Sequence, residues 1–255
     1  MPDVLADAQV ILKRNLIGFL RQPEILIGYT VQPIMFVLLF VYVFGGAINT
    51  GSLDYVDFLI PGILVQTICF GGALTAVGLT EDLNKGLIDR FRSLPMARSA
   101  VLAGRTLADV VVNCFEIAIM LIVGVIVGFS FHDTTLVRVI LGIVLLLLFG
   151  FAFSWIFALI GLYASSSESA QQFGFIAVFP LTFISSAFVP VASMPSVLRA
   201  IADVNPFTIT VDAIRALFLG TPAHNAVWGA AAWGLGLLFA AVPLAVLRYR
   251  RVSAR

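Results

Sequence analysis

Six long stretches with no charge, or with a single acid, are separated by segments that carry charged residues along this chain. Each stretch exceeds the about 20 apolar residues that an α-helix needs to cross the hydrocarbon core of a bilayer. The stretches cover residues 25–53, 58–80, 110–131, 139–167, 169–198 and 226–247. Apolar residues make up 60% of the chain and charged residues 11%, which excludes an ordinary soluble domain. The pattern predicts an all-α integral membrane protein with six transmembrane helices.

Positive charges are divided unequally between the loops that these helices would leave on the two sides of the membrane. Of the fifteen Lys and Arg residues, only Arg138, Arg199 and Arg215 follow the third or fifth stretch. The others precede the first stretch, lie between the second and third, or follow the sixth. Because loops rich in Lys and Arg stay in the cytoplasm, both termini are predicted inside. This placement accounts for the basic residues without a nucleic-acid partner.

Residues 1–22 carry the pattern of an amphipathic helix at the membrane interface. Apolar residues recur at helical spacing over residues 4–20, with acidic and basic residues on the opposite face. Two interpretations stay open at this point. The helix is either a surface anchor or a lever that passes motion beneath the membrane to the first span.

Residues 81–98, between the second and third stretches, form a second amphipathic segment. Leu87, Phe91 and Leu94 share one helical face, and charged residues cover most of the rest. Pro95 ends this helix because proline cannot donate the next backbone hydrogen bond. Periodicity alone leaves open whether the segment docks a cytosolic partner or is a solvated loop.

Motifs in this loop and downstream carry a resemblance to a known family. Arg-Phe-Arg-Ser-Leu-Pro stands at residues 90–95, Ser-Ser-Ala-Phe-Val-Pro at 185–190 and Asn-Pro-Phe at 205–207. In order and spacing, nearly the whole chain resembles the ABC-2 type permeases, in particular the daunorubicin/doxorubicin-resistance branch of bacterial exporters.

The resemblance implies one ABC-2 type transmembrane domain over residues 1–255, in a multi-pass protein of the bacterial inner membrane. Residues 1–22 would be its connecting helix, 81–98 the coupling helix in a groove of an ATPase, and 191–220 short outer re-entrant helices. Two permeases would pair and associate with two ABC ATPase subunits, in contact with membrane lipid. The residues expected to couple the chain to the ATPase are Glu81, Asp82, Lys85, Leu87, Asp89, Arg90, Phe91, Arg92, Leu94 and Arg98.

ATP chemistry is expected on the partner subunits. A Walker A loop places Gly directly before its Lys, whereas Lys13 and Lys85 follow Leu12 and Asn84. The chain is therefore expected not to be an enzyme. It is also expected to bind no metal or cofactor itself, with ATP and Mg on the ATPase.

Four polar residues within the predicted spans are candidates for the substrate path: Gln66, Thr67, Asn113 and Glu116. Polar side chains are costly in lipid, so we expect Asn113 and Glu116, three apart on one helical face, to point toward protein or water. Glu116 has two interpretations. It either contacts a cationic or hydroxylated substrate or relays protons, or it is a structural acid bonded to a neighbouring helix.

The leading interpretation is the membrane subunit of an ATP-driven exporter for an amphipathic drug-like compound or a lipid. The alternatives are an ABC exporter subunit for a polysaccharide or glycolipid, and an ion-coupled secondary transporter. A secondary transporter typically has broken helices in corresponding halves and more intramembrane acids. An intramembrane enzyme is disfavoured because no predicted span contains a His.

Cysteine labelling in a background without Cys69 and Cys114 tests the predicted orientation. We expect labels at Lys85 and Arg250 to react only from the cytoplasm, and a label at Asp133 only from outside. An external reaction at position 85 would overturn both the orientation and the assignment of the coupling loop.

Overall fold

The structure is a computed structural model that describes residues 4–51, 53–86, 98–222 and 225–252, and every regular element in these ranges is helical. The elements are α1 (Val4–Leu20), α2 (Pro23–Leu38), the π-helix η1 (Leu39–Phe44), α3 (Tyr55–Gly71), α4 (Ala73–Asn84), α6 (Arg98–Val127), α7 (Leu136–Tyr163), α8 (Ser167–Phe183), the 3-10 turn η2 (Val191–Ser193), α9 (Ser196–Val204), α10 (Pro206–Phe218) and α11 (Ala226–Val252). Within the described ranges, five helical segments are long and apolar enough to cross a membrane. They are α2 with η1, α3 with α4, α6, α7 and α11.

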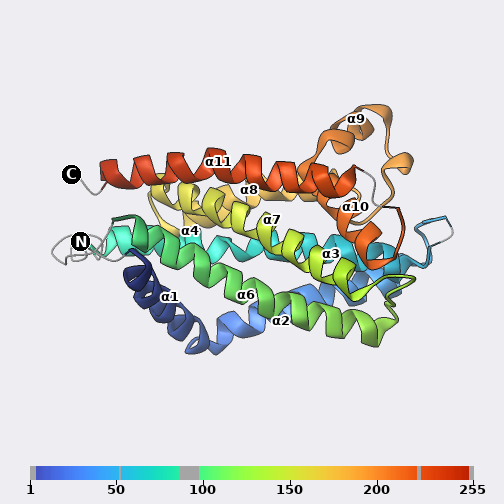
Figure 1. Ribbon diagram of the computed structural model, residues 1–255, viewed down its shortest axis with the longest axis horizontal. Helices are drawn as coiled ribbons and strands as arrows, with labels where there is room; N and C mark the ends of the chain where they lie inside the picture. Colours follow the sequence, from blue (N-terminus) through green and yellow to red (C-terminus); the bar gives the residue numbers. More distant parts are fainter. Residues whose placement is uncertain (1–3, 52, 87–97, 223–224, 253–255) are drawn as a thin grey trace.

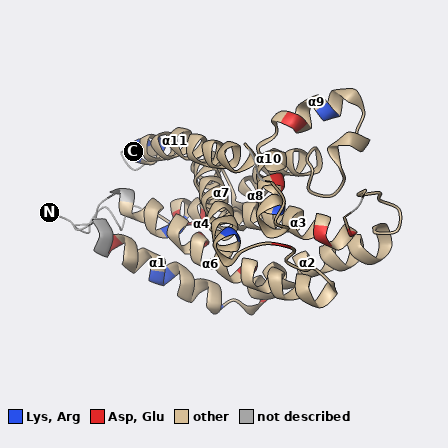
Figure 2. Ribbon diagram, turned by 45° about the vertical axis from the view of Figure 1, so that its right-hand side comes forward, with Lys and Arg blue, Asp and Glu red and all other residues tan. Residues whose placement is uncertain are grey.

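The long helices lie side by side, as Figure 1 shows. At one end of the bundle, α4 and α11 end and α6 begins; we call this the α1 end, because α1 lies beside it. Helices α9 and α10 lie at the opposite end, which we call the α9 end. Charged residues gather toward the two ends, and long stretches of the helices between them carry none (Figure 2). This distribution suits a bundle whose middle is surrounded by lipid.

The fifth predicted span is wrong in its second half. The uncharged stretch 169–198 is not one continuous helix: α8 ends at Phe183 after 17 residues, about 26 Å at 1.5 Å per residue, and α9 begins only at Ser196. The side chain of Asn205 stabilises the end of α8, because its Nδ2 donates to the carbonyl oxygens of Leu181 (2.7 Å) and Ile184 (2.6 Å). The first predicted span is likewise too long, because its helix ends at Phe44. Six spans and their orientation stay predictions.

Helix α1 packs directly on α6. Ala8 and Ile11 of α1 are buried and face Gly104 of α6. A Cβ atom at Gly104 would lie 2.6 Å from the carbonyl oxygen of Ala8 and 2.7 Å from Cβ of Ile11. Only glycine permits this approach, so the missing side chain at position 104 sets where α1 crosses α6.

Arg215 ties the start of α3 to α10 and to the turn after α8. Its Nη2 donates to the carbonyl oxygens of Phe58 (2.9 Å) and Ser186 (2.8 Å). Its Nη1 pairs with Asp212 at 2.7 Å, and the guanidinium lies 3.8 Å from the centre of the Phe58 ring. Burial lowers the pKa of Arg215 to about 10, so the side chain stays charged at neutral pH and supplies all of these interactions.

Replacing this guanidinium tests how much the α9 end depends on it. We expect Arg215→Met to lower the free energy of unfolding by about 3 kcal/mol, because two buried carbonyls and Asp212 lose a charged donor. Arg199→Met is the matched control, since Arg199 is exposed and donates to the carbonyl oxygens of the nearby Ala192 and Met194. Denaturation of both variants in mixed micelles measures the difference. Equal losses in the two variants would contradict a special role for Arg215.

Candidate functional site

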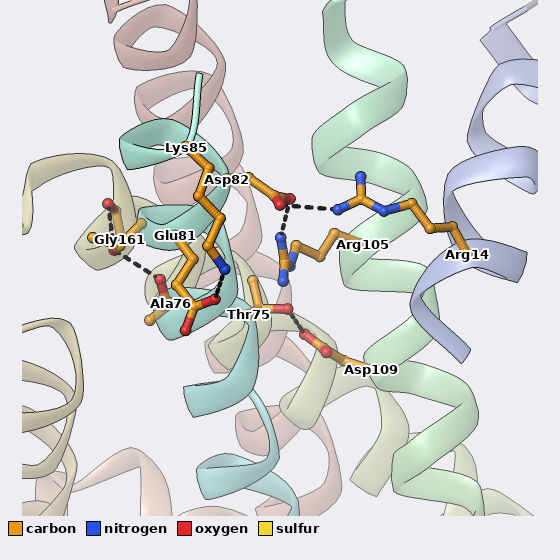
Figure 3. A network of polar contacts seen from close by, with 10 residues as sticks. Arg14, Thr75, Ala76, Glu81, Asp82, Lys85, Arg105, Asp109 and Gly161 are labelled. Atoms are coloured by element: carbon orange, nitrogen blue, oxygen red, sulfur yellow. Dashed lines mark hydrogen bonds and ion pairs between the residues drawn. The ribbon is translucent and has the colours of Figure 1, made fainter. Parts of the chain in front are cut away.

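One carboxylate joins three helices at the α1 end. Asp82, near the end of α4, is 7% exposed, and its Oδ1 lies 2.9 Å from Nη2 of Arg14 on α1. Its Oδ2 lies 2.8 Å from Nη1 of Arg105 on α6. Figure 3 shows both guanidinium groups pointing toward Asp82, that of Arg105 from α6 and that of Arg14 from α1. We refer to these three residues as the Asp82 cluster.

The face of α6 that carries Arg105 continues into the bundle as a polar row. Asp109, Asn113 and Glu116 follow at helical spacing, and each is nearly or completely buried. The hydroxyl of Thr75 donates to Oδ2 of Asp109 at 2.7 Å, which gives that carboxylate a partner (Figure 3). Both polar atoms of Asn113 and Oε2 of Glu116 have no hydrogen-bond partner within the described part of the chain.

Glu116 lines a cavity of about 300 Å³ between α2, the α3–α4 segment, α6 and α8. Gln66 and Thr67 line the same cavity, so the structure brings together three of the four residues predicted for the substrate path. The fourth, Asn113, lies immediately behind the wall. A Cβ atom on Gly71, which lines the cavity, would be 2.6 Å from Oδ1 of Asn113.

Sequence reasoning missed the aromatic part of this cavity. Phe36, Phe70, Phe175 and Phe179 line it, together with Tyr29, whose hydroxyl donates to the carbonyl oxygen of Gly71 at 3.2 Å. The available signal was the spacing of Phe175, Phe179 and Phe183, four residues apart on one face of α8. By composition alone these residues are only part of an apolar stretch.

The phenylalanines continue beyond the cavity as a chain of ring contacts. The Phe175 and Phe179 ring centroids are 4.6 Å apart, and those of Phe179 and Phe183 are 4.3 Å apart. The next ring is Phe188, whose centroid is 5.0 Å from that of Phe183 and 4.6 Å from that of Phe40 on η1. We call this series the phenylalanine ladder; it leads from the cavity toward the α9 end.

A second cavity, of about 360 Å³, lies beside the Asp82 cluster. Its charged lining residues comprise three acids and three bases: Glu81, Asp82, Asp109, Arg14, Lys85 and Arg105. Leu74 and Val77 of α4 line both cavities. The two cavities are therefore neighbours that share a wall.

Part of the predicted coupling segment is described. Glu81 and Asp82 lie in α4, and Lys85 directly follows it. Nζ of Lys85 donates a hydrogen bond to Oε2 of Glu81 at 2.8 Å, and this bond raises the pKa of Lys85. Arg98 is the first residue of α6. The other predicted coupling residues lie outside the described residues: Leu87, Asp89, Arg90, Phe91, Arg92 and Leu94.

The structure shows Asp82 bonded within the chain, a role that sequence reasoning did not give it. Its partners Arg105 and Arg14 are 23 and 68 positions away in the sequence. Its contact with an ATPase stays a prediction. Glu81, one residue earlier, is partly exposed and remains accessible to a partner.

The long apolar helices and the cavity enclosed among them define a multi-pass membrane protein. The chain belongs to the ABC-2 type transporter family, which matches residues 7–219. It is 35% identical over 243 residues to the daunorubicin resistance ABC transporter permease protein DrrB1 of Streptomyces coeruleorubidus, covering 95% of this chain and 86% of that protein. These findings confirm the resemblance noted in the sequence.

Two further relatives extend the comparison. The probable doxorubicin resistance ABC transporter permease protein DrrC of Mycobacterium tuberculosis is 26% identical over 250 residues, which cover 96% of this chain and 90% of the relative. The putative transport permease ycf38 of Cyanophora paradoxa is 30% identical over 214 residues, which cover 82% and 73%. The drug-resistance permeases among these relatives support a membrane subunit of an ABC exporter.

Asp82→Asn tests whether the Asp82 cluster holds α1 in place. We expect a local loss of about 1–3 kcal/mol, since the amide cannot pair with two guanidinium groups. Hydrogen exchange over residues 8–20 should accelerate accordingly.

The neighbouring Glu81→Gln is the matched control, because it breaks an exposed pair with Lys85 worth about 0–1 kcal/mol. It should leave exchange in α1 unchanged. The same exchange rates in both variants would show that the cluster does not anchor α1.

Proposed function

We propose that this chain is the membrane subunit of an ATP-driven exporter in the bacterial inner membrane. It moves an amphipathic drug-like compound or a lipid out of the cytoplasm or the inner leaflet. The observation that carries the proposal is the similarity to the permease DrrB1 over 95% of the chain. In this proposal α8 is the fifth of six spans, the α1 end is cytoplasmic, and α9 and α10 lie at the outer surface.

The energy source in this proposal is a pair of separate ABC ATPase subunits that bind ATP and Mg. Residues 81–98 dock in a groove of one ATPase, and a second permease, identical or similar, completes the path. The position of this segment in the chain supports the proposal, because it begins within α4 and ends at the first residue of α6, both at the α1 end.

Both helices joined by the docking segment also form cavity walls. Val77 of α4 and Glu116 of α6 line the first cavity, and the Asp82 cluster ties the two helices together nearer the segment. A displacement of the segment would therefore change the shape of the cavity. Transport requires that the nucleotide state of the ATPase and the shape of the cavity be coupled energetically.

Phe91→Ala tests the docking step. If Phe91 anchors the segment in the ATPase, its removal should cost about 2–4 kcal/mol of binding, as at an interface hot spot. We expect normal membrane insertion, reduced co-purification of the ATPase and loss of export. Phe173→Ala is the matched control, because Phe173 is an exposed phenylalanine of α8 that does not belong to residues 81–98.

Charge reversal provides a second, independent arm of the same test. Arg92→Glu should reduce co-purification, whereas Arg199→Glu, on the predicted outer side, should not. Full assembly and full export in both Phe91→Ala and Arg92→Glu would falsify the docking role of residues 81–98.

A further inference from the structure

The two neighbouring cavities differ in charge balance. Acids and bases are equal in number around the cavity beside the Asp82 cluster. The first cavity has one charged lining residue among the described residues, Glu116, and no Lys, Arg or His. A charged guest in the first cavity would therefore meet an acid with no basic residue opposing it.

The carboxylate of Glu116 also lacks the partners that acids elsewhere in the bundle possess. Asp82 has two guanidinium groups, and Asp109 has the hydroxyl of Thr75. Oε2 of Glu116 has no partner within the described ranges, although the residue is 3% exposed. A buried acid without a partner is costly in a membrane protein. A cation entering the cavity would supply the missing interaction.

The remaining wall suits the apolar part of such a ligand. Phe70, Phe175 and Phe179 present aromatic rings to the cavity, and the faces of aromatic rings attract cations. Ring stacking also favours flat apolar groups. The volume of about 300 Å³ lies at the lower bound of the about 300–1,000 Å³ of small-molecule sites.

We propose that the first cavity binds amphipathic organic cations, with the positive group at Glu116 and the apolar body against Phe70, Phe175 and Phe179. The phenylalanine ladder, which starts at the same wall, offers the apolar body a continuous aromatic surface toward the α9 end. This inference rests on the proposed function, because it takes the cavity as the substrate site. Beyond the proposed function, it states that the site selects ligands with a positive charge.

Tetraphenylphosphonium and tetraphenylborate form a suitable pair of probes, because they have nearly the same shape and opposite charges. Binding of each is measured by equilibrium dialysis against the full-length protein in nanodiscs, with empty nanodiscs subtracted. Comparing each variant with the unmodified protein cancels the unequal partitioning of the two ions into lipid. We expect Glu116→Gln to weaken phosphonium binding about tenfold or more and to strengthen borate binding, because the repulsion between the carboxylate and the anion is lost.

Three further variants make the test specific. Glu116→Asp keeps the charge and should keep the preference for the cation. Glu168→Gln makes the same chemical change at an exposed site of α8 that does not line the cavity, and it should change neither affinity. Gln171→Lys adds a positive charge to the cavity wall at an exposed position. It should weaken phosphonium binding and strengthen borate binding even if Glu116→Gln fails to fold.

The inference is overturned if the ratio of the two affinities is the same in Gln171→Lys and in the unmodified protein. It is also overturned if Glu116→Gln folds and binds phosphonium normally. Neither result depends on ATP or on the ATPase, so the outcome is separate from the docking test. A chain that binds phosphonium through Glu116 but recruits no ATPase would support this site and contradict the proposed function.

Discussion

The pairing of Asp82 with Arg14 and Arg105 is the interaction on which the arrangement of the α1 end depends. Charges in an apolar bundle are stable only when other protein groups satisfy them. One carboxylate between two guanidinium groups meets this requirement and fixes α1, α4 and α6 relative to one another. The close approach of α1 to Gly104 strengthens the same junction through packing. The junction includes Asp82 of the segment proposed to dock the ATPase, and it lies beside the wall shared by the two cavities.

Asp82 and Glu116 show how one kind of side chain takes two roles in this bundle. Both are nearly buried acids on helices of the same bundle. Asp82 is satisfied by arginines of the chain itself, which makes it a structural group. Glu116 faces a cavity with one oxygen unpaired, which makes it available to a ligand. The difference comes from the partners that neighbouring helices provide.

Much of the fold could be predicted from the sequence, because uncharged stretches and positive loops reflect the membrane directly. The inward placement of Glu116 was also predictable, since an acid in lipid is costly. The pairing of Asp82 was not, because Arg14 is distant in sequence and meets Asp82 only after α1 crosses α6. The end of α8 was missed for a similar reason. Hydropathy continues past Phe183, whereas the helix stops where Asn205 bonds its terminal carbonyls.

The aromatic wall was missed because a phenylalanine that faces lipid and one that lines a cavity give the same sequence pattern. Only the packing of α8 against the α3–α4 segment distinguishes them. Across this contact, the ring centroids of Phe70 and Phe175 are 6.2 Å apart. The aromatic wall of the cavity is therefore a property of helix packing.

Transport by the purified chain in proteoliposomes, with and without its ATPase subunits, tests the central claim most directly. The account predicts that the vesicles move an amphipathic cation only with both subunits and ATP, and that an ATPase unable to hydrolyse ATP abolishes the movement. Movement driven by a proton or sodium gradient in vesicles without the ATPase would contradict the account and favour a secondary transporter.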